Sequence, residues 1–257
     1  MTQRPLGAPP LRPLTAADLR AALRAGWRDF RAHPGPDLVF AGFFVLAGML
    51  MSWITYATGH TFWLILAVMG FPLIGTLGAV GFYEISRRRA AGEPANFAAV
   101  FATVWSRRGG QLPWLSAIII VTFMFWFFLG HMIFALFLGL SPMTNVSSSL
   151  EVFLTTEGLS MLAFGSAVGA VFATFVFAIS VMGMPMLMDR DVDFITAMLA
   201  SIRAVAASLP LYLCWGIGIA LVTLLAMVPA FLGLFIVLPI LGHATWHLYC
   251  RLAERAD

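Results

Sequence analysis

The sequence predicts an all-α, polytopic membrane protein. Six transmembrane helices form three hairpins, and each hairpin follows an amphipathic helix at the cytoplasmic interface. Three observations predict this fold class. Of the 257 residues, 61% are hydrophobic and only 11% are charged, whereas soluble domains carry about 25% charged residues. Apolar stretches of a length that crosses a bilayer core of roughly 30 Å recur along the chain. All 15 basic residues are Arg, and they lie on alternate loops.

The apolar stretches give the order of the predicted spans. They cover residues 38–58, 61–83, 112–140, 159–188, 208–228 and 229–250. Only Gly59 and His60 separate the first two, and the last two meet at Pro229, so each of these pairs must form a tight antiparallel hairpin. We assign residues 1–14 to a disordered tail and residues 15–257 to a single membrane domain.

The distribution of Arg sets the predicted orientation. Six Arg precede the first span, five follow the second, two follow the fourth and two lie at the end of the chain. Because short basic loops stay in the cytoplasm, this pattern places both termini there. The net charge of +3 therefore reflects topology and attraction to anionic lipid, and it does not indicate a nucleic-acid partner.

A shorter stretch with helical periodicity precedes each hairpin. The three apolar stripes are Leu19, Leu23, Trp27 and Phe30, then Phe97, Val100, Phe101 and Val104, then Phe194, Met198, Ile202 and Val205. Thr15 and Asn96 suit helix N-caps, and Pro34, Pro113 and Pro210 suit the first turn of the following span. The second and third copies are offset by 97 residues. We interpret this as a three-fold repeat, although amphipathic linkers and Pro kinks are common in membrane proteins.

Polar and ionisable side chains gather where three of the predicted spans reach the cytoplasmic face. They are Glu84, Asp189, Arg190, His243, His247 and Tyr249. His243 and His247 are four residues apart and share one helix face, whereas His131 lies near the opposite membrane face. Three interpretations remain open: a hydrogen-bonded network that joins the hairpins, a proton-coupled role, or a metal or haem site with His243 and His247 as ligands.

Known catalytic motifs do not occur in the sequence. It has no Walker loop, no Rossmann glycine fingerprint and no nucleophile elbow. We therefore assign no catalytic residue and no cofactor. Cys214 and Cys250 fall toward the reducing cytoplasmic side and are interpreted as packing residues. Gly165 and Gly169 form a GxxxG pair, which favours close packing of two helices within the chain over dimerisation.

Four segments resemble a family of predicted bacterial integral membrane proteins of unknown function, some of which carry the label cytochrome c oxidase. The segments are GFYEISRR at 81–88, GEP at 92–94, MDRDVDF at 188–194 and GHATWHLY at 242–249. The resemblance implies a multi-pass protein of the bacterial inner membrane. A haem-copper oxidase core needs several intramembrane His on facing helices, whereas this chain has three at two different depths. The label thus leaves a respiratory or other membrane complex as an expected partner beside the lipid bilayer.

The sequence supports a non-enzymatic function more than a catalytic one. We expect an inner-membrane protein with an accessory, assembly or organising role for other membrane components. The alternative is a small-solute or proton-coupled transporter or channel, which draws on the repeat, on the prolines within the second helices and on Glu84 with Asp189.

Overall fold

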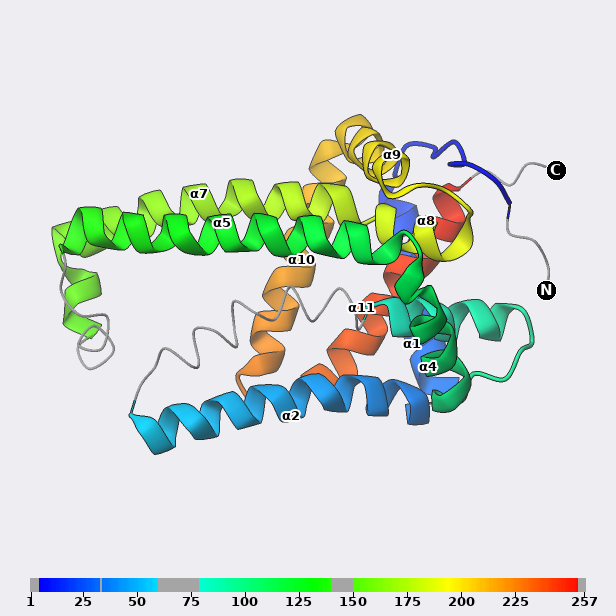
Figure 1. The fold of residues 1–257 in the computed structure, drawn as a ribbon, viewed down its shortest axis with the longest axis horizontal. Coiled ribbons are helices and arrows are strands. Elements are labelled where there is room, and N and C mark those ends of the chain that lie inside the picture. Colours follow the sequence, from blue (N-terminus) through cyan, green and yellow to red (C-terminus); the bar gives the residue numbers. More distant parts are fainter. Residues whose placement is uncertain (1–4, 33, 60–78, 140–149, 254–257) are drawn as a thin grey trace.

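The computed structural model describes residues 5–32, 34–59, 79–139 and 150–253 (Figure 1). These residues are almost entirely helical, and within them the only strand-like pairings are the single bridges Leu6–Asp191 and Leu11–Ala253. The helices are α1 (Ala16–Ala32), α2 (Pro34–Thr58), α4 (Phe97–Ser106), α5 (Leu112–Leu138), α7 (Thr156–Ser180), α8 (Gly183–Asp189), α9 (Phe194–Ala207), α10 (Leu209–Met227) and α11 (Leu234–Leu252). Residues 79–90 form a further helical segment.

Four helices in the described part of the chain are long and apolar enough to cross a membrane. They are Pro34–Thr58, Leu112–Leu138, the stretch Thr156–Asp189 that comprises α7 and α8, and Leu209–Met227. They correspond to the first, third, fourth and fifth predicted spans. Most of the second predicted span lies outside the described residues. The sixth corresponds to α11, whose C-terminal half contains His243, His247 and Arg251 and is therefore less apolar.

The predicted helix starts are confirmed. Asn96 caps α4 by accepting a hydrogen bond from the Ala99 backbone N–H at 2.9 Å. Thr15 and Asp18 at the start of α1 bond reciprocally, each side chain accepting from the other's backbone N–H, as in a capping box. Pro34 is the first residue of α2, and α5 and α10 each contain Pro in their first turn, where its missing N–H costs nothing.

Two stretches of the chain share one construction at the predicted offset of 97 residues. Helix α4 begins at Phe97 and α9 at Phe194, and the helices that follow begin at Leu112 and Leu209. Asp193 caps α9 as Asn96 caps α4, accepting from the Thr196 backbone N–H at 2.8 Å. Equal spacing, equal order and equivalent caps support a repeat over these two stretches.

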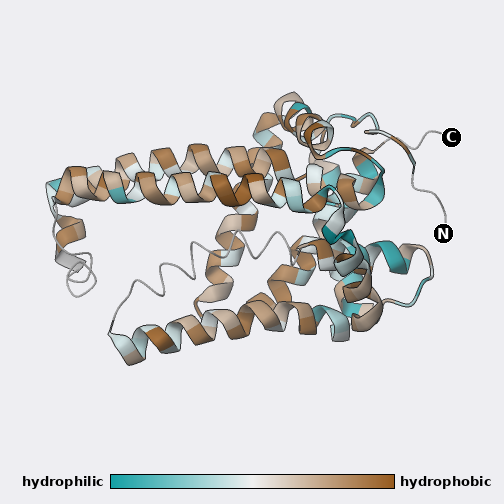
Figure 2. Ribbon diagram, viewed as in Figure 1, coloured by the Kyte–Doolittle hydropathy of each residue, from teal (hydrophilic) through white to brown (hydrophobic). Residues whose placement is uncertain are grey.

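The helices gather at one end of the molecule and extend apart from it (Figure 1). Helices α5 and α7 lie side by side as a long apolar pair, and α2 runs from the same end. Hydrophilic residues are concentrated where α1, α4, α8 and α11 meet (Figure 2). We call this region the compact end. The GxxxG pair of α7 faces α5, with Gly165 beside Ile133 and Gly169 beside Trp126, as predicted.

The segment 5–14, which the sequence analysis assigned to a tail, runs along the compact end. Its backbone pairs with Asp191 after α8 and with Leu252 at the end of α11. Leu14 is buried, and its N–H donates to the Ser208 hydroxyl at 3.1 Å. Arg12 donates to both oxygens of Asp18, at 2.6 and 2.8 Å. The segment thereby connects the start of α1 with the end of α11.

Candidate functional site

Glycines let four helices approach one another at the compact end. A side chain at Gly26 of α1 would meet the backbone of α11, at 2.6 Å from the Ile240 carbonyl oxygen. Gly242 of α11 makes room for Phe82 of the segment 79–90. Gly81 in turn makes room for Phe40 of α2. Such close approach brings short polar side chains on these helices within hydrogen-bonding distance.

His243 lies at the centre of a buried polar network. Its Nε2 is 3.0 Å from Asp37 Oδ1 on α2, and its Nδ1 is 2.8 Å from the Ser86 hydroxyl and 3.1 Å from the Phe82 carbonyl oxygen. The side chains of His243 and Asp37 are both fully buried. Arg89 lies 3.5 Å from the other Asp37 oxygen. A buried charge is tolerated only when it is paired and hydrogen-bonded, and each of these groups is.

The same network continues to α1. Ser86 donates its hydroxyl proton toward Asp29 Oδ2 at 2.6 Å, and His247 Nε2 is 2.7 Å from the same oxygen. Burial alone would raise the pKa of Asp29, but the hydrogen bonds from His247 and Ser86 lower it overall. Asp29 and His247 keep 18% and 25% of their side chains exposed. We call the whole set the His–Asp network: Asp29, Asp37, Ser86, Arg89, His243 and His247.

The Ser86, His243 and Asp37 side chains contain the groups of a nucleophilic triad, but their arrangement differs from one. A triad Ser gives its proton to the His in the reaction, whereas the Ser86 proton is directed toward Asp29. Ser86 is 1% exposed, so a substrate carbonyl has no approach to its oxygen. The chemistry that this geometry supports is proton sharing and helix attachment.

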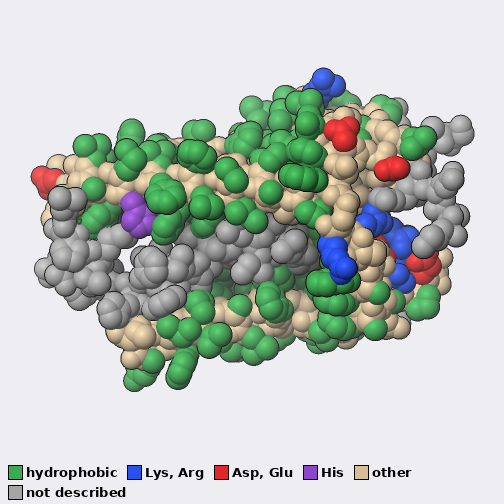
Figure 3. Space-filling model, in the orientation of Figure 1, with side chains coloured by type: hydrophobic (Ala, Val, Ile, Leu, Met, Phe, Trp, Pro, Cys, Tyr) green, Lys and Arg blue, Asp and Glu red, His purple; other side chains and the backbone are tan. Residues whose placement is uncertain are grey.

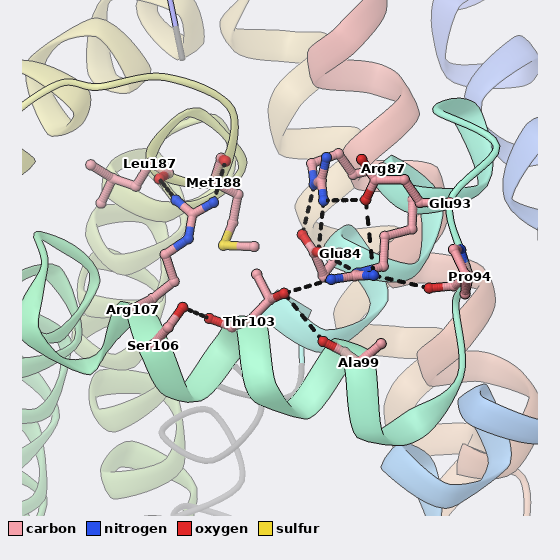
Figure 4. A network of polar contacts seen from close by, with 11 residues as sticks. Glu84, Arg87, Glu93, Pro94, Ala99, Thr103, Ser106, Arg107, Leu187 and Met188 are labelled. Atoms are coloured by element: carbon pink, nitrogen blue, oxygen red, sulfur yellow. Dashed lines mark hydrogen bonds and ion pairs between the residues drawn. The ribbon is translucent and has the colours of Figure 1, made fainter. Parts of the chain in front are cut away.

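Glu84 belongs to a second network, which joins the segment 79–90 to α4 (Figure 4). Its carboxylate accepts from Arg87 at 2.8 and 2.9 Å and from Arg88 at 2.7 Å. Burial alone would raise the pKa of Glu84, but the hydrogen bonds from Arg87 and Arg88 lower it overall. Arg88 also donates to the Thr103 hydroxyl of α4 at 2.8 Å. The network thereby attaches α4 to the segment 79–90.

Asp189, Arg190 and Tyr249 form a third group. The Tyr249 hydroxyl donates to Asp189 Oδ2 at 2.9 Å, and Arg190 pairs with the same oxygen at 3.2 Å. Tyr249 is two residues from His247, so it lies about 200° around α11 and faces α8. The six predicted site residues thus occupy three separate networks of the compact end. A functional role for them stays a prediction.

Four residues of the His–Asp network were not among the predicted site residues: Asp29, Asp37, Ser86 and Arg89. A signal for Asp29 exists in the sequence, since it follows Ala22 and Gly26 at helical spacing, on the face beside the apolar stripe of α1. Asp37 stands directly before the first apolar stretch. A carboxylate at the start of a span is costly to bury, which could have marked it as the partner of a buried His.

His243 and His247 share a helix face, but their ring nitrogens point to different carboxylates, Asp37 and Asp29. In the described part of the chain, no group of three or more His, Cys, Asp or Glu is arranged to hold a metal ion.

The surface of the compact end differs from that of the long helices. Hydrophobic side chains cover α5 and α2, whereas most of the charged side chains in this view lie at the compact end, on the right (Figure 3). Each short helix also exposes large apolar residues one turn apart: Leu23 and Trp27 on α1, Phe97, Phe101 and Trp105 on α4, and Ile195 and Leu199 on α9. The Arg108 guanidinium lies 4.5 Å from the centre of the Trp105 ring.

Long apolar helices around a charged, helical end define a multi-pass integral membrane protein. Residues 63–189 match the model of a family described as predicted integral membrane protein (DUF2189), which is the family that the sequence segments resemble. The match covers 127 of the 257 residues. No curated protein and no solved structure matches the chain.

Proposed function

We propose that the protein is a six-span, non-enzymatic protein of the bacterial inner membrane, with both termini in the cytoplasm, and that it assembles or organises other membrane components. The second and sixth predicted spans, residues 61–83 and 229–250, complete the three hairpins in this proposal. The segregation of Arg supports the orientation. The large apolar residues that α1, α4 and α9 expose support a position of these helices in the cytoplasmic interface. The predicted stripe of α9 itself packs against the core.

The single observation that carries the proposal is the way the three short helices are built. All three expose large apolar residues. Against the protein, α1 buries the small residues Ala22 and Gly26 and α9 buries Ala197 and Ser201, whereas α4 buries Val100. In α4 the rings of Phe97, Phe101 and Trp105 stack in sequence, and aromatic rings favour the membrane interface. This surface suits contact with lipid headgroups and with neighbouring membrane proteins.

The topology is tested with reporter fusions in a bacterial host. A reporter active only in the cytoplasm should work after residue 257 and within residues 91–96, and one active only outside should work after residue 155. A cytoplasmic signal after residue 155 would contradict the proposed orientation.

The organising role is tested by purification from native membranes. The tagged full-length protein is extracted in mild detergent, and its companions are identified by mass spectrometry. We expect a stoichiometric membrane complex, and the resemblance implies a respiratory complex as the first candidate. Loss of the complex on Trp105→Ala, but not on Trp53→Ala in the exposed apolar face of α2, would locate the contact on α4. A protein that purifies alone would contradict the organising role.

A proton-coupled transporter is the second candidate, and the His–Asp network favours it. The network connects the partly exposed His247 and Asp29 with the fully buried His243 and Asp37, and buried ionisable groups near a membrane are typical of proton pathways. The test compares His247→Gln, Glu84→Gln and Asp189→Asn. A growth defect at normal protein level, with loss of flux in liposomes, would favour transport, whereas loss of the protein itself would favour a structural role.

A further inference from the structure

We infer that the outward face of α1 binds anionic phospholipids, with the guanidinium groups of four Arg on the lipid phosphates. The four residues, which we call the Arg row, are Arg20, Arg24, Arg28 and Arg31. The inference rests on the position of α1 in the membrane interface that is proposed above, and it names the class of lipid that this helix contacts there.

The charges of α1 are divided between its inner and outer faces. The helix contains two carboxylates, and both face the protein. Asp18 is buried and pairs with Arg12 at 2.6 Å. Asp29 contacts Ser86 and His247. All four residues of the Arg row are exposed instead, so the outward face of α1 carries positive charge alone.

The Arg row is continuous along the helix. Its members are four, four and three residues apart, so they lie within about 80° of one another around the axis, over a length of roughly 16 Å. Among the residues that the structure describes, none of the four forms an ion pair. A partner with several negative charges at a similar spacing therefore fits this face.

Apolar side chains border the Arg row along one side. Leu23 and Trp27 are 38% and 47% exposed, and the Arg31 guanidinium lies 6.0 Å from the centre of the Trp27 ring. Basic residues beside exposed Trp and Leu are typical of helices at a membrane surface, where the apolar side chains enter the acyl boundary. An acidic soluble protein would match the charge alone, whereas an anionic membrane surface matches both the charge and the apolar border.

The packing of α1 agrees with a position at the level of the lipid headgroups. The helix lies along the C-terminal half of α11, with Gly26 against the Ile240 carbonyl and Asp18 3.4 Å from Arg251. Figure 1 shows α11 inclined to the long α5–α7 pair, so α1 is inclined to this pair as well. Arg side chains are costly to place in the hydrocarbon core, and the Arg row therefore belongs at the surface of the bilayer.

A comparison of the three short helices assigns the headgroup contact to α1. Helix α4 contains no Arg and α9 contains only Arg203, although both expose large apolar residues. The guanidinium group matches the geometry of a phosphate with two parallel N–H donors. The row of four on α1 thus provides the attraction to anionic lipid that the other two helices lack.

The experiment measures which lipid lies beside Trp27 in the reconstituted full-length protein. The bilayers contain phosphatidylcholine and a minor fraction of phosphatidylglycerol, and bromine, which quenches Trp fluorescence, is attached to one lipid or to the other at equal mole fraction. The Trp27 signal is the difference between the protein and Trp27→Phe. We expect phosphatidylglycerol to be enriched beside Trp27 by at least about fivefold, the preference that one Arg contributes near an anionic surface. Equal quenching by the two lipids would overturn the inference.

Trp53 of α2 is the control within the same protein. It is 65% exposed on a helix that contains no Arg, so the difference between the protein and Trp53→Phe should show no enrichment. An equal enrichment beside Trp27 and Trp53 would contradict a specific role of α1.

Substitutions of the Arg row test its charge. Changing all four Arg to Gln should abolish the enrichment beside Trp27, whereas changing all four to Lys should retain most of it. The four side chains are exposed, so we expect both variants to fold. Enrichment that persists in the Gln variant would contradict the inference. If the Gln variant does not fold, the comparison of Trp27 with Trp53 in the unmodified protein still decides.

The result is independent of the orientation and of the organising role proposed above. Both leaflets of these bilayers have the same composition, so a reversed orientation or the absence of a membrane complex would not remove the enrichment beside Trp27. If phosphatidylglycerol were not enriched and the Gln variant instead lost a companion protein from native membranes, the Arg row would bind an acidic protein. That outcome would overturn the inference and leave the organising role in place.

Discussion

At the compact end, α1 meets α11 with a glycine against backbone atoms, whereas α7 meets α5 with two glycines against side chains. The first contact surrounds buried charges that are paired across four helices. The second is apolar along its length, and most of the two helices' surface faces outward. Both are helix pairs that rely on small residues, but they depend on different interactions.

This difference between polar and apolar helix contacts indicates which part of the protein selects a single arrangement of its helices. Lipid is as apolar as Leu, so apolar contact alone does little to select one arrangement of α5 and α7. The hydrogen bonds of Asp29 with Ser86 and of Asp37 with His243 are directional and costly to break. We therefore expect substitutions at the compact end to have large effects and equivalent substitutions in the α5–α7 pair to have small ones.

The largest effect is expected for Asp37→Ala. It leaves Arg89 and His243 near a buried site without their carboxylate, which costs about 3–5 kcal/mol of unfolding free energy. Reversible unfolding in detergent micelles measures the change. Glu93→Ala, which removes a carboxylate that is 43% exposed, is the control and should cost less than about 1 kcal/mol. Equal effects of the two would contradict the importance of the buried pair.

The next effect concerns the glycine between α1 and α11. Gly26→Ala places a methyl group 2.6 Å from the Ile240 carbonyl oxygen, so the two helices must separate, at a cost of about 1–3 kcal/mol. The control is Gly130→Ala in α5, where nothing lies within 4 Å and the higher helix propensity of Ala should stabilise. If Gly26→Ala raised the unfolding midpoint as Gly130→Ala is expected to do, Gly26 of α1 would not lie against the backbone of α11.

The sequence predicted the helices better than their contacts. Local signals such as Pro34, Asn96 and the 97-residue offset lie in the chain itself, so helix starts could be identified from the sequence. The partner of each helix could not, because α1 and α11 are more than 200 residues apart and apolar stripes do not say which face meets which helix. The six-span arrangement stays a prediction, since most of its second span lies outside the described residues.

The candidate site shows the same limit. Helical spacing placed His243 and His247 on one face, and the structure has them there. The sequence could not show that Tyr249 faces α8 or that Glu84 pairs with the neighbouring Arg87 and Arg88. Nor could it show that Asp37 is the partner of His243. These assignments depend on the rotation of α11 against α1 and α2, and glycines such as Gly242 set that rotation through contacts distant in the sequence.

A smaller effect is expected in the α5–α7 pair. Gly169→Ala places a methyl group 3.2 Å from the Trp126 ring nitrogen, and a side chain can shift where a backbone cannot. We expect a change of less than about 1 kcal/mol, partly offset by the propensity of Ala. The same unfolding assay compares it with Gly26→Ala. A loss as large as that of Gly26→Ala would show that both helix pairs depend on close backbone contact.

The smallest effect is a pH dependence at the start of α1. Hydrogen bonds from Arg12, opposed by burial and assisted by Thr15, hold the pKa of Asp18 below its ordinary value. A carboxyl with a lower pKa in the folded state stabilises the fold above its unfolded pKa of about 3.9, and this contribution is lost as the pH falls below that value. Arg12→Ala should therefore cost only about 0.5 kcal/mol at pH 7, since Arg12 is partly exposed, and progressively less below pH 4. Unfolding midpoints at pH 7 and pH 3 measure this difference. An equal cost at both pH values would mean that Arg12 stabilises α1 through packing of the segment 5–14, and not through the charge of Asp18.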